Sequence, residues 1–242
     1  MVEQCLQYGE ISIPYQVFFV PGRQDRVAIH VHPDGSVQVD APTQASLAEI
    51  KQAVGKRCRW LSTHLDIIKR QRMHLLSREY VSGESHFYLG RRYLLKVRVN
   101  GLEDPSVKLR HGQLQVTTDN SDRETIKSLL WRWYRIHAHD QFDRRLDDLC
   151  QKLSWINSKP SWKLLTMKKQ WGSCSPKGLI SLNPHLVKAP SACIDYVLLH
   201  ELCHLKRHDH SPAFYRLLRK EIPAWESVKS RLDGMAELLL NE

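Results

Sequence analysis

The chain has 242 residues, of which 42% are hydrophobic and 26% are charged, so it has enough apolar material for one or two globular domains. No run of about 18 uncharged apolar residues is present, and the first ten residues lack both the basic and the apolar segment of a secretory signal, which predicts a cytoplasmic protein that does not cross a membrane. Six scattered cysteines without CxxC spacing argue against a disulfide framework and a cysteine-rich zinc site.

The formal net charge of +10 is concentrated in the C-terminal half. Residues 1–125 contain 17 basic and 14 acidic side chains, whereas residues 126–242 contain 19 and 12. The segment between Leu149 and Ile194 has no acidic residue but has seven lysines, namely Lys152, Lys159, Lys163, Lys168, Lys169, Lys177 and Lys188. Such a surface attracts phosphates, nucleic acid or acidic peptides, or is simply a solvated lysine-rich face.

The first half of the chain is predicted to be rich in β-strands. Polar and apolar residues alternate over 16–20, 27–32 and 36–40, with a turn at Pro33-Asp34-Gly35. Residues 46–73 then carry apolar side chains at helical spacing with basic residues between them, which predicts a basic amphipathic helix or helix pair. Strand character returns over 87–99 and 107–117, the second with a turn at His111-Gly112. We therefore expect an α+β portion over residues 1–120, built largely of antiparallel strands.

The polar break at Asn120-Ser121-Asp122 is the predicted domain boundary, and residues 121–242 form the second predicted domain. The elements expected there are, in chain order, a helix from Glu124 to about Leu153, a strand over Lys163–Lys169, a turn over Trp171–Gly178, a short strand over Leu179–Leu182, a helix opening at Pro190-Ser191, and a final helix after Ser211-Pro212. The strand over Leu179–Leu182 is a candidate edge for an extended peptide.

The strongest chemical signal is the HExxH sequence from His200 to His204. In a helix, histidines at positions i and i+4 lie on one face about 6 Å apart along the axis, so both imidazoles can reach one metal ion. Glu201 lies beside the pair, where its carboxylate can act as general base on a metal-bound water. Because the flanking residues are nearly all apolar, two histidines and a glutamate would be costly at that depth unless a metal pairs with them.

The third ligand is a choice between His208 and His210. On a straight helix His208 would place three imidazoles nearly in a row, an arrangement that tetrahedral zinc disfavours. His210 precedes Ser211 and Pro212, a good N-cap and first-turn pair, so the chain can turn there and bring the imidazole back. We favour His210 and expect one Zn²⁺ ion, or another divalent metal in its place, held by His200, His204 and His210.

The chain resembles the YgjP-like metallopeptidase-domain family, and more distantly SprT-like zincins, over about residues 25–235. The resemblance rests on Trp171-Gly172-Ser173-Cys174 followed by HELxHLxxxxxH, on His210-Ser211-Pro212-Ala213-Phe214, and on the Trp60 helix and the Tyr88-Leu89-Gly90 strand. It implies His200, His204 and His210 as metal ligands and Glu201 as the catalytic residue. It departs at Gln170, where a basic residue is often found. The expected fold is α+β, with a zincin-like C-terminal domain in which the HExxH helix lies under a small antiparallel sheet.

Three functions fit these features. The leading one is metallopeptidase-type hydrolysis with a metal-bound water activated by Glu201. The second is metal-dependent phosphohydrolysis of a nucleotide or another anion, which the lysine-rich segment would suit. The third is a nucleic-acid-associated protein with a structural metal site and a phosphate-binding helix over Lys51–Arg78. The expected partners are thus a peptide, protein or small anionic substrate, with nucleic acid as a candidate for the basic surface and no membrane. The Trp171–Cys174 segment has two interpretations. It can line the metal cleft, with Ser173 or a backbone N–H stabilising an oxyanion, or, as we favour, it can shape the wall of the cleft, with Gly172 as a positive-φ turn residue.

Overall fold

The computed structural model describes residues 2–8, 11–20, 27–31, 35–73 and 78–240, and its contacts divide the chain into two compact units, Met1–Leu76 and Ser77–Glu242. The predicted boundary at residues 120 and 121 instead falls within the second unit. The reason is that the strands before that boundary pack on the helix after it, in one shared hydrophobic core.

The first unit is a four-stranded sheet with two helices. Its elements are β1 (Val2–Tyr8), β2 (Ile11–Val20), β3 (Ala28–Val31), β4 (Val37–Pro42), α1 (Leu47–Gly55) and α2 (Cys58–Met73), and the strand order is β1-β2-β4-β3. The helix pair expected over residues 46–73 is confirmed. Ser46 caps α1 in a capping box with Glu49. Ile50 and Val54 of α1 pack with residues of the sheet in the hydrophobic core of this unit. Pro33 and Asp34 of the predicted turn lie outside the described residues.

The second unit begins with another four-stranded sheet, formed by β5 (Ser85–Tyr88), β6 (Arg91–Val99), β7 (Ser106–Arg110) and β8 (Gln113–Thr118) in the order β5-β6-β8-β7. Its two hairpins turn at Leu89-Gly90 and His111-Gly112, where both central residues have positive φ, as type I′ turns require. The expectation of largely antiparallel strands is confirmed for four of the six strand pairs of these two sheets, and the other two pairs are parallel. β2 pairs with β4, and β6 with β8, in parallel, so both sheets are mixed and share one strand order.

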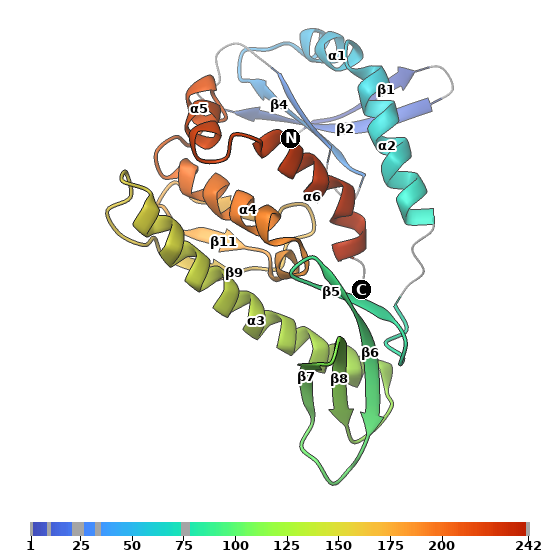
Figure 1. The fold of residues 1–242 in the computed structure, drawn as a ribbon. Coiled ribbons are helices and arrows are strands. Elements are labelled where there is room, and N and C mark those ends of the chain that lie inside the picture. The colour runs from blue at the N-terminus through green and yellow to red at the C-terminus, as the bar shows by residue number, and fades with distance from the viewer. Residues whose placement is uncertain (1, 9–10, 21–26, 32–34, 74–77, 241–242) are drawn as a thin grey trace. The chain divides into compact units, whose positions relative to one another are not determined.

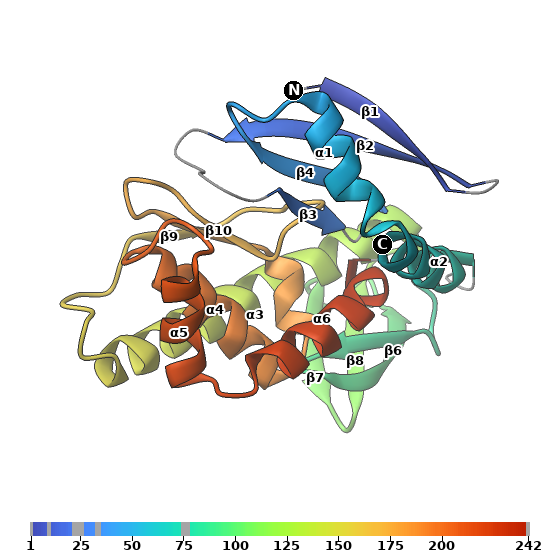
Figure 2. The same ribbon diagram turned by 90° about the horizontal axis from the view of Figure 1, so that it is seen from above.

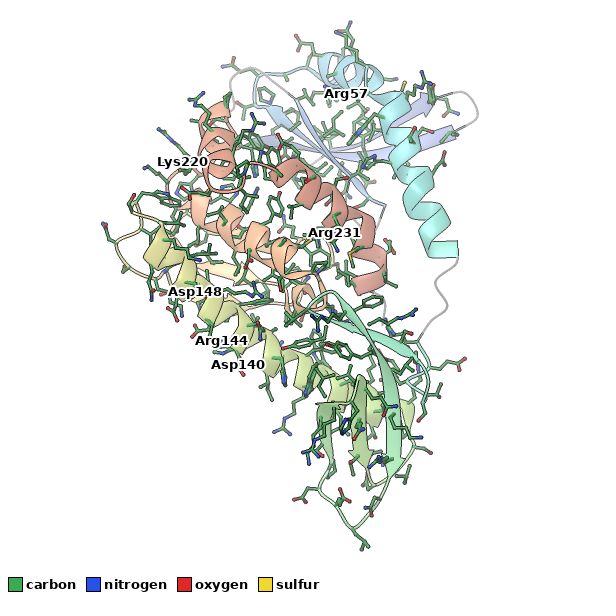
Figure 3. The ribbon with its side chains drawn as sticks, viewed as in Figure 1. Arg57, Asp140, Arg144, Asp148, Lys220 and Arg231 are labelled. Atoms are coloured by element: carbon green, nitrogen blue, oxygen red, sulfur yellow. The ribbon has the colours of Figure 1, made fainter. Side chains whose placement is uncertain are left out.

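A long helix, α3 (Arg123–Lys152), covers one face of the second sheet (Figure 1). Asp122 caps its first turn by accepting a hydrogen bond from the backbone of Thr125, as the polar break predicts. Asp140, Arg144 and Asp148 follow one another at intervals of four residues and point away from the core (Figure 3). The opposite side of the helix is apolar and buried.

The third sheet is small and mixed. It contains β9 (Trp162–Leu164), β10 (Gly172–Cys174) and β11 (Ile180–Leu182) in the order β10-β11-β9, with β10 antiparallel and β9 parallel to β11. Three expectations are therefore wrong: the sheet is not antiparallel, part of the predicted turn over Trp171–Gly178 is a strand, and the strand near Leu179–Leu182 is central rather than an edge. The strand predicted over Lys163–Lys169 ends at Leu164.

A 3₁₀ turn, η1 (Pro184–Lys188), leads to three helices, α4 (Ser191–His204), α5 (Pro212–Glu221) and α6 (Trp225–Leu240). Two helices follow Ser211-Pro212 where one was expected, because Pro223 cannot continue α5. α4 packs against α3, α5, α6 and β10, and Figure 2 shows it between α3 and α6. Among the described helices, none has the length and apolar composition needed to span a bilayer.

Candidate metal centre

The HExxH sequence lies in the last turns of α4, as its apolar pattern predicts. The flanking residues Leu198, Leu199, Leu202 and Cys203 are all 1% exposed or less, so the helix is buried nearly all round. Arg145 of α3 fixes its first turn, with hydrogen bonds of 2.6 Å to the Asp195 carboxylate and 2.9 Å to the Ser191 hydroxyl. The two histidines therefore project from a helix that is held on several sides.

The helix ends at His204, and the chain then turns back. The backbone N–H groups of Leu205, Lys206 and Arg207 bond to carbonyls of the preceding turn, and Ser211 caps α5 with Pro212 in its first turn. His208 therefore does not continue a helical stripe, and it is exposed and separate from the histidine cluster. His210, at the start of the returning segment, is brought beside His200, as the sequence predicts.

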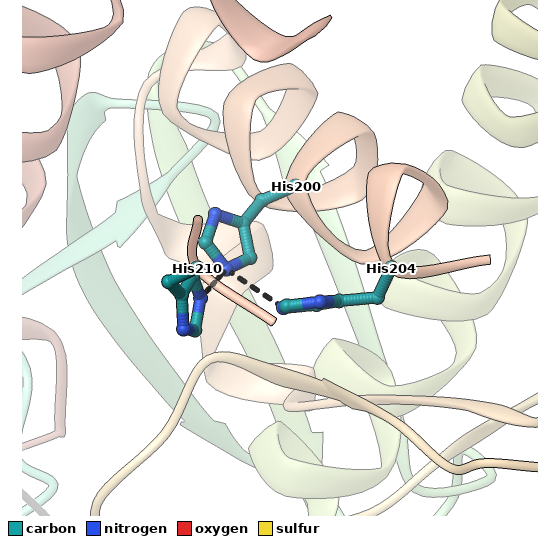
Figure 4. Close-up of side chains that lie close together, drawn as sticks. All are labelled: His200, His204 and His210. Atoms are coloured by element: carbon teal, nitrogen blue, oxygen red, sulfur yellow. Dashed lines mark hydrogen bonds between the residues drawn. The ribbon is translucent and has the colours of Figure 1, made fainter. Parts of the chain in front are cut away.

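Three ring nitrogens converge on one point (Figure 4). Nε2 of His200 lies 3.2 Å from Nε2 of His204 and 3.1 Å from Nε2 of His210, and the ligand atoms of all three residues are within 4.8 Å of one another. Zinc bound by nitrogen at 2.0–2.1 Å in a tetrahedron places its ligand atoms about 3.3 Å apart. Within the described ranges this is the one group of three or more histidine, cysteine or acidic residues so placed. The cluster thus has the size and donor set of a zinc site.

The protonation of the cluster also suits a metal. The Nδ1 atom of His204 lies 3.1 Å from the backbone carbonyl of Arg207, which favours a proton on Nδ1 and leaves the Nε2 lone pair directed at the cluster. Burial, followed by the neighbouring imidazoles, lowers the pKa of His200 well below its usual value, and burial lowers the pKa of His204. Both rings are therefore neutral near pH 7, the form in which histidine binds a metal.

Glu201 lies deep beside the histidines and against strand β10. Its side chain is 5% exposed, and burial raises the pKa of its carboxyl to about 8. Within the described structure, its Oε2 atom has no hydrogen-bond partner. A β-carbon added at Gly172 would meet Oε1 of Glu201 at 2.7 Å, so only glycine fits opposite the carboxylate. Gly172 does not have the positive φ that we expected, and its role is this close approach.

A family model described as "YgjP-like, metallopeptidase domain" matches residues 25–235. The chain belongs to the YgjP-like family. Two solved structures are similar to part of this YgjP-like chain. The metallopeptidase zymogen of Pyrococcus abyssi abylysin is 24% identical in sequence, with a TM-score of 0.34. The match covers 43% of this chain and 97% of the zymogen. The zymogen of Methanocaldococcus jannaschii jannalysin is 23% identical with a TM-score of 0.33, covering 42% and 96%. The comparison with curated proteins gave no match.

Membership of a metallopeptidase-domain family indicates a metal-dependent hydrolase, with a divalent metal that is typically zinc. The family that the sequence motifs predict is therefore confirmed. The α+β class that we expected for it is also observed, with mixed sheets.

Two further residues of the YgjP-like domain support the site, and the sequence motifs assign a role to neither. Phe214 of α5 is fully buried, and its ring centroid lies 4.9, 4.7 and 5.0 Å from those of His200, His204 and His210. It therefore packs against all three imidazoles. The signal in the sequence was its place at the end of the His210–Phe214 run, three residues after the Ser211 cap.

The second residue is Asn183, which is fully buried. Its amide donates hydrogen bonds to the carbonyls of Met167 (2.7 Å) and Gln170 (3.0 Å), and its side-chain oxygen accepts one from the backbone of His185. These bonds fix the loop that leads into β10. Asn183 thus positions the strand that packs on Glu201.

The lysine-rich segment does not form one continuous cationic surface. Lys188 is buried, with its amino group 2.9 Å from Nδ1 of His185. Lys159 bonds to the carboxylates of Asp143 and Asp147 on α3. Such pairing reduces the charge available to an anionic substrate. The six cysteines are all free thiols, and Cys203, although it is buried and lies within the HExxH sequence, is outside the metal cluster.

Proposed function

We propose that this chain is a zinc-dependent hydrolase of the metallopeptidase type, with His200, His204 and His210 as the metal ligands. The convergence of their three Nε2 atoms carries the proposal. Three histidine ligands are the number typical of catalytic zinc sites, which keep the fourth position for water or substrate, whereas structural sites usually have four protein ligands. Family membership supports the same class of activity.

Glu201 would be the general base. A bound zinc ion supplies Lewis acidity, which activates water and polarises the carbonyl group under attack. The Glu201 carboxylate would accept the proton of the attacking water and later transfer it to the leaving amine. Its Oε2 atom, without a partner among the described residues, fits this role, because a reacting carboxylate needs a lone pair that the protein does not occupy. Burial alone favours the protonated form, and the positive charge of a bound zinc ion would restore the carboxylate. Because Gly172 has no β-carbon, the carboxylate can pack directly against β10.

An extended peptide is the substrate that fits the surroundings of Glu201. β10 is an edge strand of its sheet, and the same strand packs on Glu201 through Gly172. A peptide that added itself to this edge by backbone hydrogen bonds would pass next to the general base. β10 is therefore the proposed peptide-binding edge in place of β11 (Ile180–Leu182), which has neighbouring strands on both sides.

A substrate panel tests the proposal. Zinc-loaded wild type and Glu201→Gln are assayed on a mixture of unstructured peptides, on an unfolded protein and on nucleoside triphosphates. Peptide cleavage by wild type, lowered in Glu201→Gln by a factor of about 10² or more at unchanged zinc content, is the expected result. Hydrolysis of nucleotides alone would contradict the peptidase function and support the phosphohydrolase function. Zinc binding without hydrolysis of any substrate would favour a structural metal site.

A further inference from the structure

The β5–β8 sheet has one covered face and one open face. Side chains alternate between the two faces of a strand, so residues 95 and 97 of β6 and residues 114 and 116 of β8 point the same way. These four, Leu95, Val97, Leu114 and Val116, belong to the core on which α3 packs (Figure 1). The opposite face carries the intervening residues of all four strands.

Cations dominate the open face. Five of its side chains are basic and exposed, namely Arg92, Lys96 and Arg98 on β6 and Lys108 and Arg110 on β7; we call this surface the basic sheet face. Its remaining positions on β6, β7 and β8 are Leu94, Ser106, Gln113, Gln115 and Thr117, so acidic residues are absent from these three strands. None of the five cations has an ion-pair partner in the described part of the chain.

The strand register organises these charges into two rows. Lys96 and Lys108 both pair with Gln115, from opposite sides. The rows on β6 and β7 therefore flank β8 and are about 10 Å apart, twice the spacing of neighbouring strands. Within a row, alternate residues such as Lys96 and Arg98 are about 7 Å apart. The strand between the rows offers the amides of Gln113 and Gln115, which both donate and accept hydrogen bonds.

Two rows of unpaired cations with polar amides between them suit a chain of regularly spaced negative charges. A face four strands wide is broader than the two-stranded ribbon that a major groove admits, but it can contact an unpaired strand, with cations on the phosphates and amides on the exposed base edges. A lipid surface fits less well, because Leu94 on β6, at 47% exposure, is the only large hydrophobic side chain that β6, β7 and β8 place on this face. We propose that the basic sheet face binds single-stranded nucleic acid through its phosphate backbone.

The test is the salt dependence of binding to a labelled oligonucleotide of about 20 nucleotides, measured by fluorescence anisotropy with the full chain. For single strands, the slope of log K against log salt is about −0.7 for each phosphate contact. Each of the double variants Lys96→Gln/Arg98→Gln and Lys108→Gln/Arg110→Gln should therefore bind more weakly, with a slope shallower by about 1.4. The affected side chains are exposed, so both variants should keep the melting temperature of the wild type.

The matched control is Lys163→Gln/Lys177→Gln. It removes the same charge from exposed positions in the lysine-rich segment of the same unit, and it should leave the slope unchanged. An equal loss of affinity in all three variants would show that binding depends only on the net charge of the chain, and it would overturn the proposal. A slope unchanged in the two sheet variants, stronger binding of a duplex, or binding only to vesicles that contain anionic lipid would also overturn it.

Discussion

Replacing Gly172 by alanine should impair catalysis without removing the metal. The new β-carbon would lie 2.7 Å from Oε1 and 2.8 Å from Cγ of Glu201. Ordinary contact begins at 3.4 Å, so the carboxylate must move by about 0.7 Å. Overpacking of this kind costs about 1–3 kcal/mol, and a misplacement of about 1 Å at a reacting group can cost about 10² in rate. We expect kcat to fall by about 10- to 100-fold.

The assay is peptidase turnover and zinc content measured on the same preparation. Zinc should stay at about one per chain, because the clash involves Glu201 and none of the three imidazoles. Gly234→Ala is the control: its β-carbon would meet no atom within 4 Å in α6, so turnover should equal that of wild type. A Gly172→Ala enzyme with wild-type kcat would refute the close packing of β10 on Glu201.

Two further changes test the surroundings of the site, and a third tests the buried His86 of β5. Phe214→Leu removes the ring that packs on all three histidines and should weaken zinc affinity by about 10- to 100-fold in a chelator competition. Asn183→Ala leaves two carbonyls without their buried donor and should lower the free energy of unfolding by about 2–4 kcal/mol in urea. Burial, then the charges of Arg78 and Lys188, lowers the pKa of His86 to about 3. As the pH falls from about 6.5 towards 3, the unfolded chain therefore takes up a proton at His86 that the folded chain does not. Stability is lost over that range, and His86→Gln should remove about 1.4 kcal/mol per pH unit of this loss.

The part of the site that is local in sequence could be predicted. The i, i+4 spacing places His200 and His204 on one helical face, and the Ser211-Pro212 pair marks the start of α5, so the return of His210 follows from capping preferences. Likewise Asp122 marks the start of α3. These signals act within a few residues, where the chemistry of the backbone decides the outcome.

The rest depends on contacts between distant residues. From the sequence alone Gly172 looks like a turn residue, but in the structure it lies in a strand, opposite Glu201. That this strand, β10, is at the edge of its sheet is likewise decided by the pairing of distant segments. The parallel pairing of β6 with β8 joins strands that are not consecutive, which the alternation of polar and apolar residues does not encode. For the same reason the boundary between the units differs from the predicted one. Ile126 of α3 and Leu114 and Val116 of β8 belong to one buried core, which unites both sides of residue 120.

The zinc content of His210→Ala and His208→Ala, measured beside wild type, tests the central claim most directly. Wild type should bind about one zinc per chain. His210→Ala should lose it, because two remaining imidazoles hold the ion poorly, and His208→Ala should keep it, because His208 is outside the cluster. Loss of zinc from His208→Ala with retention by His210→Ala would contradict the assignment of the third ligand and, with it, the geometry proposed for this centre.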